Sequence, residues 1–310
     1  MKFPKTKRSN YIKKLFDKRW VDFFKGYKEL NKKIANKKYN LKDENQIYQI
    51  HRAMFTYEMI KRNYKKGSKI LDLGCGNGFL TFFLNKKKYS AIGFDYSQTA
   101  IDQGIEIDNE FNLGLKNKIF VDDLNYLKKI KKNSIHAVVA LGVMRYLDKK
   151  SLDLVYRNVH RILKKNGSFI VSNENELFDI YALNDGTEDF WVKKLSSMSS
   201  SKKLFSEKLL RKFYRSTFNL PRRSFTKISV SKHVGKHLEN PLTYSSKVKR
   251  YGYELKENIF PDPNILPPLI EKKINKKKLY KLKSNLCLEI SKTWIANFMG
   301  SEMLSRIIKK

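Results

Sequence analysis

Short apolar runs alternate with helical patterns through the middle of this chain. Apolar runs begin near residues 69, 91, 119 and 134, and a fifth follows Gly167. Between the fourth and the fifth, Leu152, Val155, Val159 and Ile162 recur at helical spacing. Continuous apolar runs are typical of strands that are covered on both faces, and helices between them predict a parallel sheet. The pattern therefore predicts an α/β fold.

The first apolar run leads into a glycine-rich turn, with glycines at 74, 76 and 78 before a helix that begins at Phe79. Alternate glycines allow positive φ and close approach of a ligand, and the helix N-terminus offers free N–H groups. The spacing is not the Gly-x-Gly-x-x-Gly of dinucleotide sites, because position 79 is Phe. A tight strand-to-helix connection is the alternative interpretation.

Acidic residues follow the next two runs: Asp95 ends the second, and Asp122 and Asp123 end the third. Taken singly, Asp95 could cap a helix, and Asp122 or Asp123 could be a turn residue. The carboxyl ends of parallel strands meet at the edge where open α/β sheets bind ligands. Three such signals in succession therefore favour a ligand site at this edge.

This succession resembles motif I and the following strand ends of the class I S-adenosylmethionine-dependent methyltransferases, over residues 45 to 175. The resemblance implies a Rossmann-like seven-stranded sheet with helices on both faces. It also implies S-adenosylmethionine as cofactor and S-adenosylhomocysteine as product. Asp95 would hold the ribose, the acids after strand three would hold the adenine, and Cys75 would be a small residue facing the ligand. The implied cofactor-binding residues are Asp72, Gly74, Cys75, Gly76, Asn77, Gly78, Asp95, Tyr96, Asp122, Asp123, Leu124 and Leu141.

The same resemblance divides the chain into four parts. These are a basic helical extension and lid at 1–66, the cofactor-binding core at 67–172, an acceptor cap insertion at 173–240, and the completion of the sheet at 241–310. In the last part, 252–260 resembles the sixth strand and 303–308 the final antiparallel strand. The proline-broken segment 261–269 is similar to a loop of small-molecule enzymes related to the ubiquinone pathway and to surface-polysaccharide synthesis.

The methyl acceptor is constrained mainly by missing motifs. Residues 141–146 lack the Asn/Asp-Pro-Pro-Tyr/Phe turn of base and amide methyltransferases, and no cysteine stands where RNA cytosine C5 enzymes keep their nucleophile. We therefore expect a small-molecule or glycan-type acceptor, methylated at oxygen. An RNA methyltransferase and a noncatalytic S-adenosylmethionine-binding or RNA-associated scaffold are the alternatives. The candidate acceptor and catalytic residues are Asn173, Glu174, Arg145, Tyr146 and His233.

Charge adds a second feature: 65 basic and 30 acidic residues give a net charge of +35. The excess is largest outside the predicted core, and such an excess suits polyanionic partners. Lysines make up most of the basic residues, and lysine is less suited than arginine to bidentate phosphate recognition. Nucleic acid is therefore a possible partner, but a solvated surface is the favoured interpretation.

Other classes of protein fit the sequence less well. No run of 18 apolar residues occurs, and no apolar segment follows the charged N-terminus, so we expect a cytoplasmic protein with no transmembrane segment. Two cysteines provide no disulfide framework. His233 and His237 have metal-ligand spacing, but Gly235 lies between them and no Glu or Cys accompanies them, so no metal site is expected.

Overall fold

The computed structural model describes residue 17, residues 44–114, 117–198, 206–217, 220, 237–271, 273–275, 279, 283, 286 and 289–310. His233 lies outside the described residues. So does the amphipathic helix that the apolar spacing predicts between residues 9 and 38, apart from Asp17.

An eight-stranded sheet runs through the molecule in the order β3-β2-β1-β4-β5-β8-β7, with β6 paired to β5. β1 to β5 are parallel neighbours, and β8 lies antiparallel between β5 and β7. The strands are β1 Lys69–Leu73, β2 Ser90–Asp95, β3 Ile119–Val121, β4 Ile135–Ala140, β5 Leu163–Asn175, β6 Leu238–Glu239, β7 Tyr253–Ile259 and β8 Glu302–Lys309.

The predicted Rossmann-like α/β sheet is confirmed, including the antiparallel last strand. The expected strand number of seven is short by one, because β6 adds a two-residue strand to β5, pairing Leu238 with Glu174. β5 is also longer than its apolar run. It continues to Asn175 because β8 and β6 provide hydrogen-bonding partners beyond Ser172.

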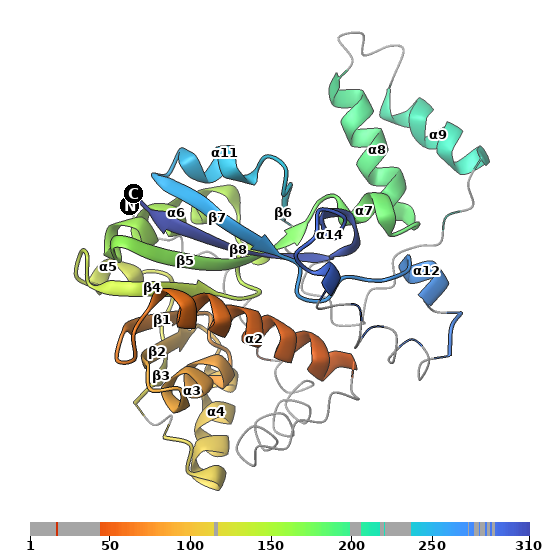
Figure 1. Cartoon of the computed structure of the whole chain (residues 1–310). Helices are drawn as coiled ribbons and strands as arrows, with labels where there is room; N and C mark the ends of the chain where they lie inside the picture. The colour runs from red at the N-terminus through yellow and green to blue at the C-terminus, as the bar shows by residue number, and fades with distance from the viewer. Residues whose placement is uncertain are drawn as a thin grey trace.

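Helices cover both faces of the sheet (Figure 1). α2 Glu44–Asn63, α3 Phe79–Lys86 and α4 Gln98–Phe111 lie on one face, and α5 Tyr126–Lys129, α6 Lys149–Ile162 and α11 Tyr244–Lys249 lie on the other. β4 shows why both faces are buried. Val138 and Ala140 pack into the core under α6 and α11, whereas Ala137 and Val139 pack against α2 and α3. Alternate side chains of a strand point to opposite faces, so a strand covered on both sides must be apolar throughout.

The insertion after β5 forms helices that stand away from the sheet (Figure 1). α7 Phe178–Tyr181 leads into α8 Asp185–Met198, and α9 Glu207–Thr217 matches the helix that the apolar spacing predicts from Ser206. Arg211 of α9 pairs with Glu188 and Asp189 of α8 at 3.0 and 2.7 Å, which ties the two helices together. Further short helical segments in the described part of the chain are η1 Met144–Tyr146, α12 Pro268–Glu271 and α14 Ala296–Met299.

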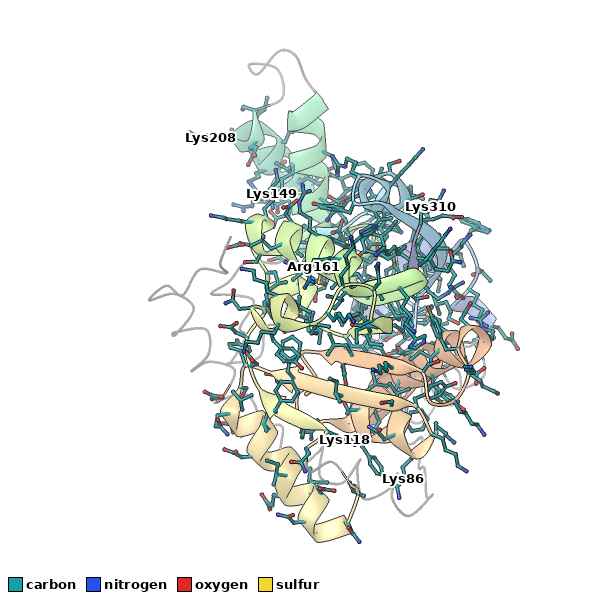
Figure 2. All side chains as sticks on the ribbon, turned by 90° about the vertical axis from the view of Figure 1, so that its left-hand side faces the viewer. Lys86, Lys118, Lys149, Arg161, Lys208 and Lys310 are labelled. Atoms are coloured by element: carbon teal, nitrogen blue, oxygen red, sulfur yellow. The ribbon has the colours of Figure 1, made fainter. Side chains whose placement is uncertain are left out.

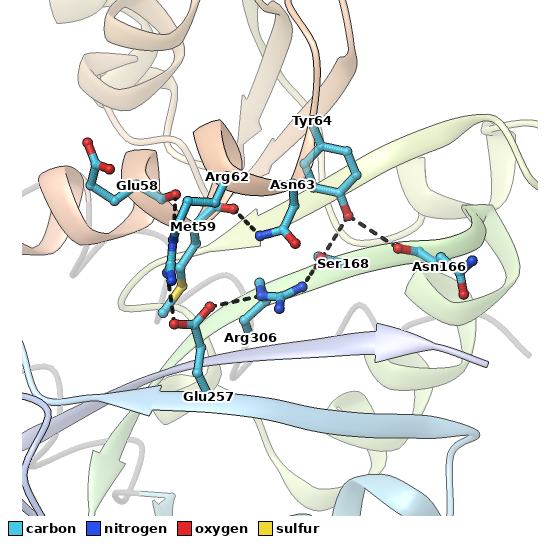
Figure 3. Close-up of polar contacts among 9 residues, drawn as sticks. All are labelled: Glu58, Met59, Arg62, Asn63, Tyr64, Asn166, Ser168, Glu257 and Arg306. Carbon is cyan, nitrogen blue, oxygen red and sulfur yellow. Dashed lines mark hydrogen bonds and ion pairs between the residues drawn. The ribbon is translucent and has the colours of Figure 1, made fainter.

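A polar cluster joins α2 and the residue that follows it to the β5–β8–β7 side of the sheet (Figure 3). Glu257 of β7 accepts from Arg62 at 2.9 Å and from Arg306 of β8 at 2.9 Å. The Tyr64 hydroxyl donates to Ser168 of β5 at 2.7 Å. The two arginines differ in environment, because the Arg306 side chain is 14% exposed and that of Arg62 is 53% exposed. Glu257 therefore neutralises one nearly buried cation and one solvated cation.

We predict that Glu257→Ala lowers the free energy of unfolding by about 2 kcal/mol, because it leaves the Arg306 guanidinium without its carboxylate in a mostly buried position. Arg62→Ala breaks only the solvated pair and should cost less than about 1 kcal/mol. Urea denaturation of both variants and the wild type measures the difference. Equal losses in the two variants would contradict the unequal roles assigned to the arginines.

Candidate functional site

The turn after β1 takes a backbone path that only glycines follow easily. Gly74, Gly76 and Gly78 have φ of 71°, 56° and 78°, in the left-handed region, as the alternating glycines predict. Gly78 is also the N-cap of α3. A Cβ atom on Gly74 would lie 2.3 Å from Cγ2 of Val143, so this position has no room for a side chain. The turn thus exposes main chain between β1 and the N-terminus of α3, the arrangement that binds anionic or polar groups.

Asp95, at the end of β2, is held by the main chain of this turn. Its Oδ2 accepts from the Gly76 N–H at 3.0 Å, and its Oδ1 accepts from the Ser97 N–H at 2.9 Å. Burial raises the pKa of Asp95, although the N–H groups of Ser97 and Gly76 oppose that shift. A carboxylate has about four lone-pair sites, and these bonds use two of them. Asp95 can therefore still accept hydrogen bonds from a ligand.

Asp72 lies on the face of β1 that packs beneath α3. Its Oδ2 accepts from the Thr81 hydroxyl of α3 at 2.8 Å, and only 3% of the residue is exposed. Burial raises the pKa of Asp72 to about 7, and the neighbouring Asp95 adds to the increase. Of the predicted cofactor residues, Asp72 is thus the one that ties the helix to the strand.

Cys75 differs from its expected orientation. Its side chain packs against Gly93 of β2 and the apolar cluster under α3 and α4, rather than facing a ligand. A Cβ atom on Gly93 would lie 2.6 Å from the Cys75 Cβ. The two small residues therefore fit against each other. Burial, together with Asp72 and Asp95, raises the pKa of the thiol, which disfavours a nucleophilic thiolate.

The remaining predicted cofactor residues lie around the ends of β2 and β3. The Asp122 N–H donates to the Asp95 carbonyl at 3.0 Å, which places the two strand ends side by side. Asp122 also pairs with Lys129 at 2.8 Å, and Asp123 accepts from the Asn125 N–H as a turn residue does. Leu124 packs on the main core, and Asn77 is buried. Burial raises the pKa of Tyr96, with further contributions from Asp95 and from Asp17, which accepts from the Ser97 hydroxyl.

The predicted acceptor residues meet at the ends of β4 and β5. Arg145 of η1 forms an ion pair with Glu174 of β5, and its guanidinium lies 5.1 Å from the ring of Tyr146. Asn173 is 2% exposed and lies beside the Tyr244 hydroxyl. Neither amide atom of Asn173 makes a well-formed hydrogen bond with the described residues. Leu141 precedes Gly142, whose N–H donates to the Ser172 hydroxyl at 2.7 Å and so fixes the turn after β4.

A histidine outside the predicted set stands in this region. The His237 N–H donates to the Arg145 carbonyl at 3.2 Å, and Nε2 of the His237 ring lies 2.7 Å from Oε1 of Glu239. Lys247 of α11 pairs with the same carboxylate. Burial raises the pKa of Glu239, but His237 and Lys247 outweigh burial and hold the pKa below its usual value. The spacing of His237 and Glu239 was visible in the sequence, but their place beside Arg145 depends on β6.

α2 supplies a further side chain to this edge of the sheet. Arg52 forms an ion pair with Glu302 of β8 at 3.2 Å, with side chains 13% and 10% exposed. Its Nη1 also lies 3.4 Å from where a Cβ atom on Gly142 would stand. Arg52 and Asp72 attract each other electrostatically. A buried cation therefore lies between the cofactor residues and the acceptor residues.

Two further properties limit the chemistry available to the described part of the chain. No group of three or more His, Cys, Asp or Glu residues in it is arranged to hold a metal ion. Among the same residues, no helix combines the length and the apolar character needed to cross a membrane.

We predict that the free energy of unfolding of Asp72→Asn, taken relative to that of the wild type at the same pH, is higher at pH 8 than at pH 5. The folded-state pKa lies above the ordinary value of 3.8, so the unfolded chain loses its proton first as pH rises. Wild-type stability therefore falls between about pH 4 and pH 7, by about 3 kcal/mol from pH 5 to pH 8. Asn keeps an acceptor for Thr81 and does not ionise. Chemical denaturation at the two pH values measures the effect.

Asp102→Asn is the matched control, because Asp102 is exposed on α4 and the charge change is the same. A stability difference between Asp72→Asn and the wild type that is the same at both pH values would contradict a raised pKa at Asp72.

The known proteins that resemble this chain agree with the site. A family described as "Methyltransferase domain" matches residues 64–218. None of the curated proteins matches the sequence. Several solved structures resemble the fold. One is a SAM-dependent methyltransferase from Archaeoglobus fulgidus, with 14% identity and a TM-score of 0.46, covering 85% of this chain and 94% of that one. Another is an S-adenosylmethionine-dependent methyltransferase from Mesorhizobium loti, with 15% identity and a TM-score of 0.48, covering 84% and 98%.

A third is the geranyl diphosphate C-methyltransferase of Streptomyces coelicolor A3(2), solved with S-adenosyl-L-homocysteine. It has 13% identity and a TM-score of 0.45, and the match covers 83% of this chain and 76% of that one. Values this low support no conclusion about the acceptor. The family match is different, because it spans half of the sequence and includes the glycine turn and the ends of β2 to β5. The chain therefore belongs to the methyltransferase domain family, as the glycine motif and the strand-end acids predicted.

Proposed function

We propose that this chain transfers a methyl group from S-adenosylmethionine to a small-molecule or glycan-type acceptor, at oxygen. The observation that carries the cofactor assignment is the carboxylate of Asp95, which lies at the end of β2 and is bonded to the main chain of the glycine turn. In this proposal its remaining lone pairs accept hydrogen bonds from the ribose hydroxyls. The ends of β1 and β3 on either side of β2 would then hold the methionine part and the adenine.

The acceptor assignment is supported by the polar residues at the end of β5. Methyl transfer from a sulfonium is an in-line displacement, so holding the acceptor close and collinear provides much of the acceleration. The buried Asn173 amide can donate to and accept from an acceptor hydroxyl. The Arg145 guanidinium offers a cation to an acceptor that bears an acidic group, and Glu174 fixes its position.

His237 replaces His233 as our candidate for the group that removes the acceptor proton. Oε1 of Glu239 and Nζ of Lys247 lie 2.7 and 3.2 Å from Nε2 of the imidazole and so orient the ring. In the tautomer that donates Nε2–H to Glu239, the other ring nitrogen, Nδ1, is the basic one and can take a proton from a hydroxyl. A neutral hydroxyl is a poor nucleophile, whereas an amine with a free lone pair needs no base. The dyad therefore suits methylation at oxygen.

We predict that Asp95→Ala weakens S-adenosylmethionine binding by about 2 to 4 kcal/mol, or about 30- to 1,000-fold, because hydrogen bonds to a charged group are lost. Gly76→Val should also abolish binding, because a branched side chain is strained at a φ of 56° and occupies space beside the turn. Titration calorimetry with S-adenosylmethionine measures both effects. Asp102→Ala, with the same loss of charge on the exposed side of α4, should bind normally. Unchanged affinity in Asp95→Ala would remove Asp95 from the cofactor site.

For the acceptor residues, we predict that Asn173→Ala, Glu174→Gln and His237→Gln keep cofactor affinity within about threefold and lower turnover at least about 100-fold, the scale of a lost general base or positioning group. The assay follows labelled methyl transfer from S-adenosylmethionine to nucleotide sugars, hydroxylated small molecules and total RNA. Asn158→Ala is the control, because this amide bonds only within α6, to the Leu154 carbonyl.

Turnover of His237→Gln that recovers as pH rises would support the loss of a base, since hydroxide then replaces it. Full turnover in all three variants would place the acceptor elsewhere on the molecule. Methylation of RNA in preference to every small acceptor would favour the RNA methyltransferase instead. Cofactor binding without turnover on any acceptor class would favour the noncatalytic alternative.

A further inference from the structure

The amino-terminal edge of the sheet, opposite the candidate site, collects basic residues. β1 to β5 begin at this edge, and β8 ends there, because it is antiparallel and pairs Ile308 with Ser168. Figure 2 views the molecule from this side, with Lys86, Lys118, Arg161 and Lys310 among the labelled side chains. The stretches that form the edge are 64–69, 86–90, 117–118, 128–134, 161–167, 249–252 and 309–310.

These stretches, which we call the amino edge, hold eighteen lysines and arginines and no aspartate or glutamate. The whole chain has about one acidic residue for every two basic ones, so even mixing would place about eight acids there. Acids lie instead at the opposite edge, where Asp95 ends β2 and Glu174 lies next to the end of β5. A genome whose base composition favours lysine codons would raise the lysine content everywhere in the chain. It would not separate basic residues from acidic ones. The segregation is therefore a property of the fold.

The basic groups of the amino edge lie close enough to affect one another. Nζ of Lys164 is 3.1 Å from Nε2 of His136. The pKa of His136 is lowered first by burial and then by Lys164, with smaller contributions from other lysines of the edge. Burial likewise lowers the pKa of Lys309, and Lys132 lowers it further. Carboxylates outside these stretches neutralise some of the charge, as in the Lys129–Asp122 and Lys310–Glu254 pairs. Most of the eighteen basic residues remain in excess over these carboxylates.

The stretch 128–134, which has four lysines, is held in place by the fold. The Arg161 guanidinium donates to the carbonyls of Leu127 and Ile130 at 2.7 and 3.0 Å, at the start of the 128–134 loop. Lys309 donates to the Asn133 side chain at 2.7 Å, at the end of that loop. The lysines of the loop therefore extend from an ordered main chain, so less conformational entropy is lost when a ligand binds.

The remaining side chains of the amino edge indicate which polyanion fits. The large exposed apolar residues of the described chain, such as Trp294 and Leu242, all lie outside the amino edge. A membrane-binding surface would combine basic groups with apolar side chains that insert into the bilayer, and a single-strand binding surface would offer exposed aromatic rings to the bases. A surface of lysines that has neither exposed apolar side chains nor exposed aromatic rings fits a polymer that presents only phosphates. A base-paired duplex does so, because its bases are stacked inside.

We propose that the amino edge binds the phosphodiester backbone of a double-stranded nucleic acid without sequence preference. Seven strands spaced about 4.8 Å apart give the edge a length of about 30 Å, which spans several successive phosphates. Strands of about six residues place the edge roughly 20 Å from the candidate site. The bound duplex is therefore not the methyl acceptor in this position. It localises the protein and leaves the reaction edge accessible.

The test compares two charge-reversal variants of the full chain. The edge variant carries Lys66→Glu, Lys131→Glu, Lys132→Glu and Lys165→Glu, all at exposed positions. The control variant carries Lys150→Glu, Lys208→Glu, Lys212→Glu and Lys273→Glu, which are also exposed but lie away from the amino edge. The net charge changes equally in both. Fluorescence anisotropy with labelled RNA and DNA duplexes of about 20 base pairs, between about 50 and 200 mM salt, measures Kd and its salt dependence.

We expect the edge variant to bind at least about tenfold more weakly at about 100 mM salt, with the salt slope reduced by about 3, whereas the control stays within about threefold of the wild type. Equal weakening in both variants, or no wild-type binding at about 100 mM salt, would overturn the proposal. Binding of phosphatidylserine vesicles that only the edge variant loses, with duplex binding unchanged, would overturn it in favour of a membrane. Tighter binding of one of the two duplexes shows whether the phosphodiester backbone that the amino edge prefers is that of RNA or of DNA.

Both variants should keep the wild-type unfolding midpoint and S-adenosylmethionine affinity, so failure here is separable from failure of the proposed function. If the edge variant does not fold, lysine-to-glutamine substitutions at the same four positions remove the charge with less electrostatic strain, and the same loss of duplex affinity is expected.

Discussion

The carboxylate of Asp95 is the group on which the arrangement of the candidate site depends. It joins the turn after β1 to the N-cap of α4, through the N–H groups of Gly76 and Ser97. A peptide N–H can point at a buried carboxylate only if the chain turns sharply, which the left-handed glycines at 74, 76 and 78 permit. Burial makes the charge costly, and the main-chain donors offset part of that cost. The same two N–H groups therefore fix the path of the glycine turn and stabilise the buried charge of Asp95.

The sequence was sufficient where local patterns determine the outcome. Each of the first five strands contains an apolar run, and the sheet buries both faces, so each run predicts a strand, although β5 extends beyond its run at both ends. β6 could not be predicted, because two residues carry no pattern and form a strand only by pairing with the end of β5. The direction of Cys75 was missed for a similar reason, since it follows from the space left by Gly93 on the neighbouring strand. His233 and His237 could not be told apart as candidate bases from the sequence, and β6 places His237 beside Arg145.

The two edges of the sheet divide the charge of the chain between them. Parallel strands bring all their carboxyl ends to one side and all their amino ends to the other, so residues that are scattered along the sequence meet according to their position within a βα unit. In this chain Asp95 ends β2, Asp122 follows β3 and Glu174 lies next to the end of β5, whereas lysines are frequent before the strands. The overall charge of +35 hides this division, and composition alone could not distinguish a solvated surface from an ordered basic edge.

The Asn173 amide has a consequence for molecular recognition. It is nearly inaccessible to solvent, and with the described residues neither its donor nor its acceptor is well satisfied. A compound that places a hydroxyl against it would complete both interactions, whereas an analogue that ends there in a methyl or hydrogen would trap an unsolvated dipole. Sites of this kind lower kcat/KM for the less polar analogue by several orders of magnitude. An apolar pocket discriminates much less between substrates that differ only in size. Under the proposed function, the strand that ends at Asn175 would therefore select the acceptor by chemical type rather than by bulk.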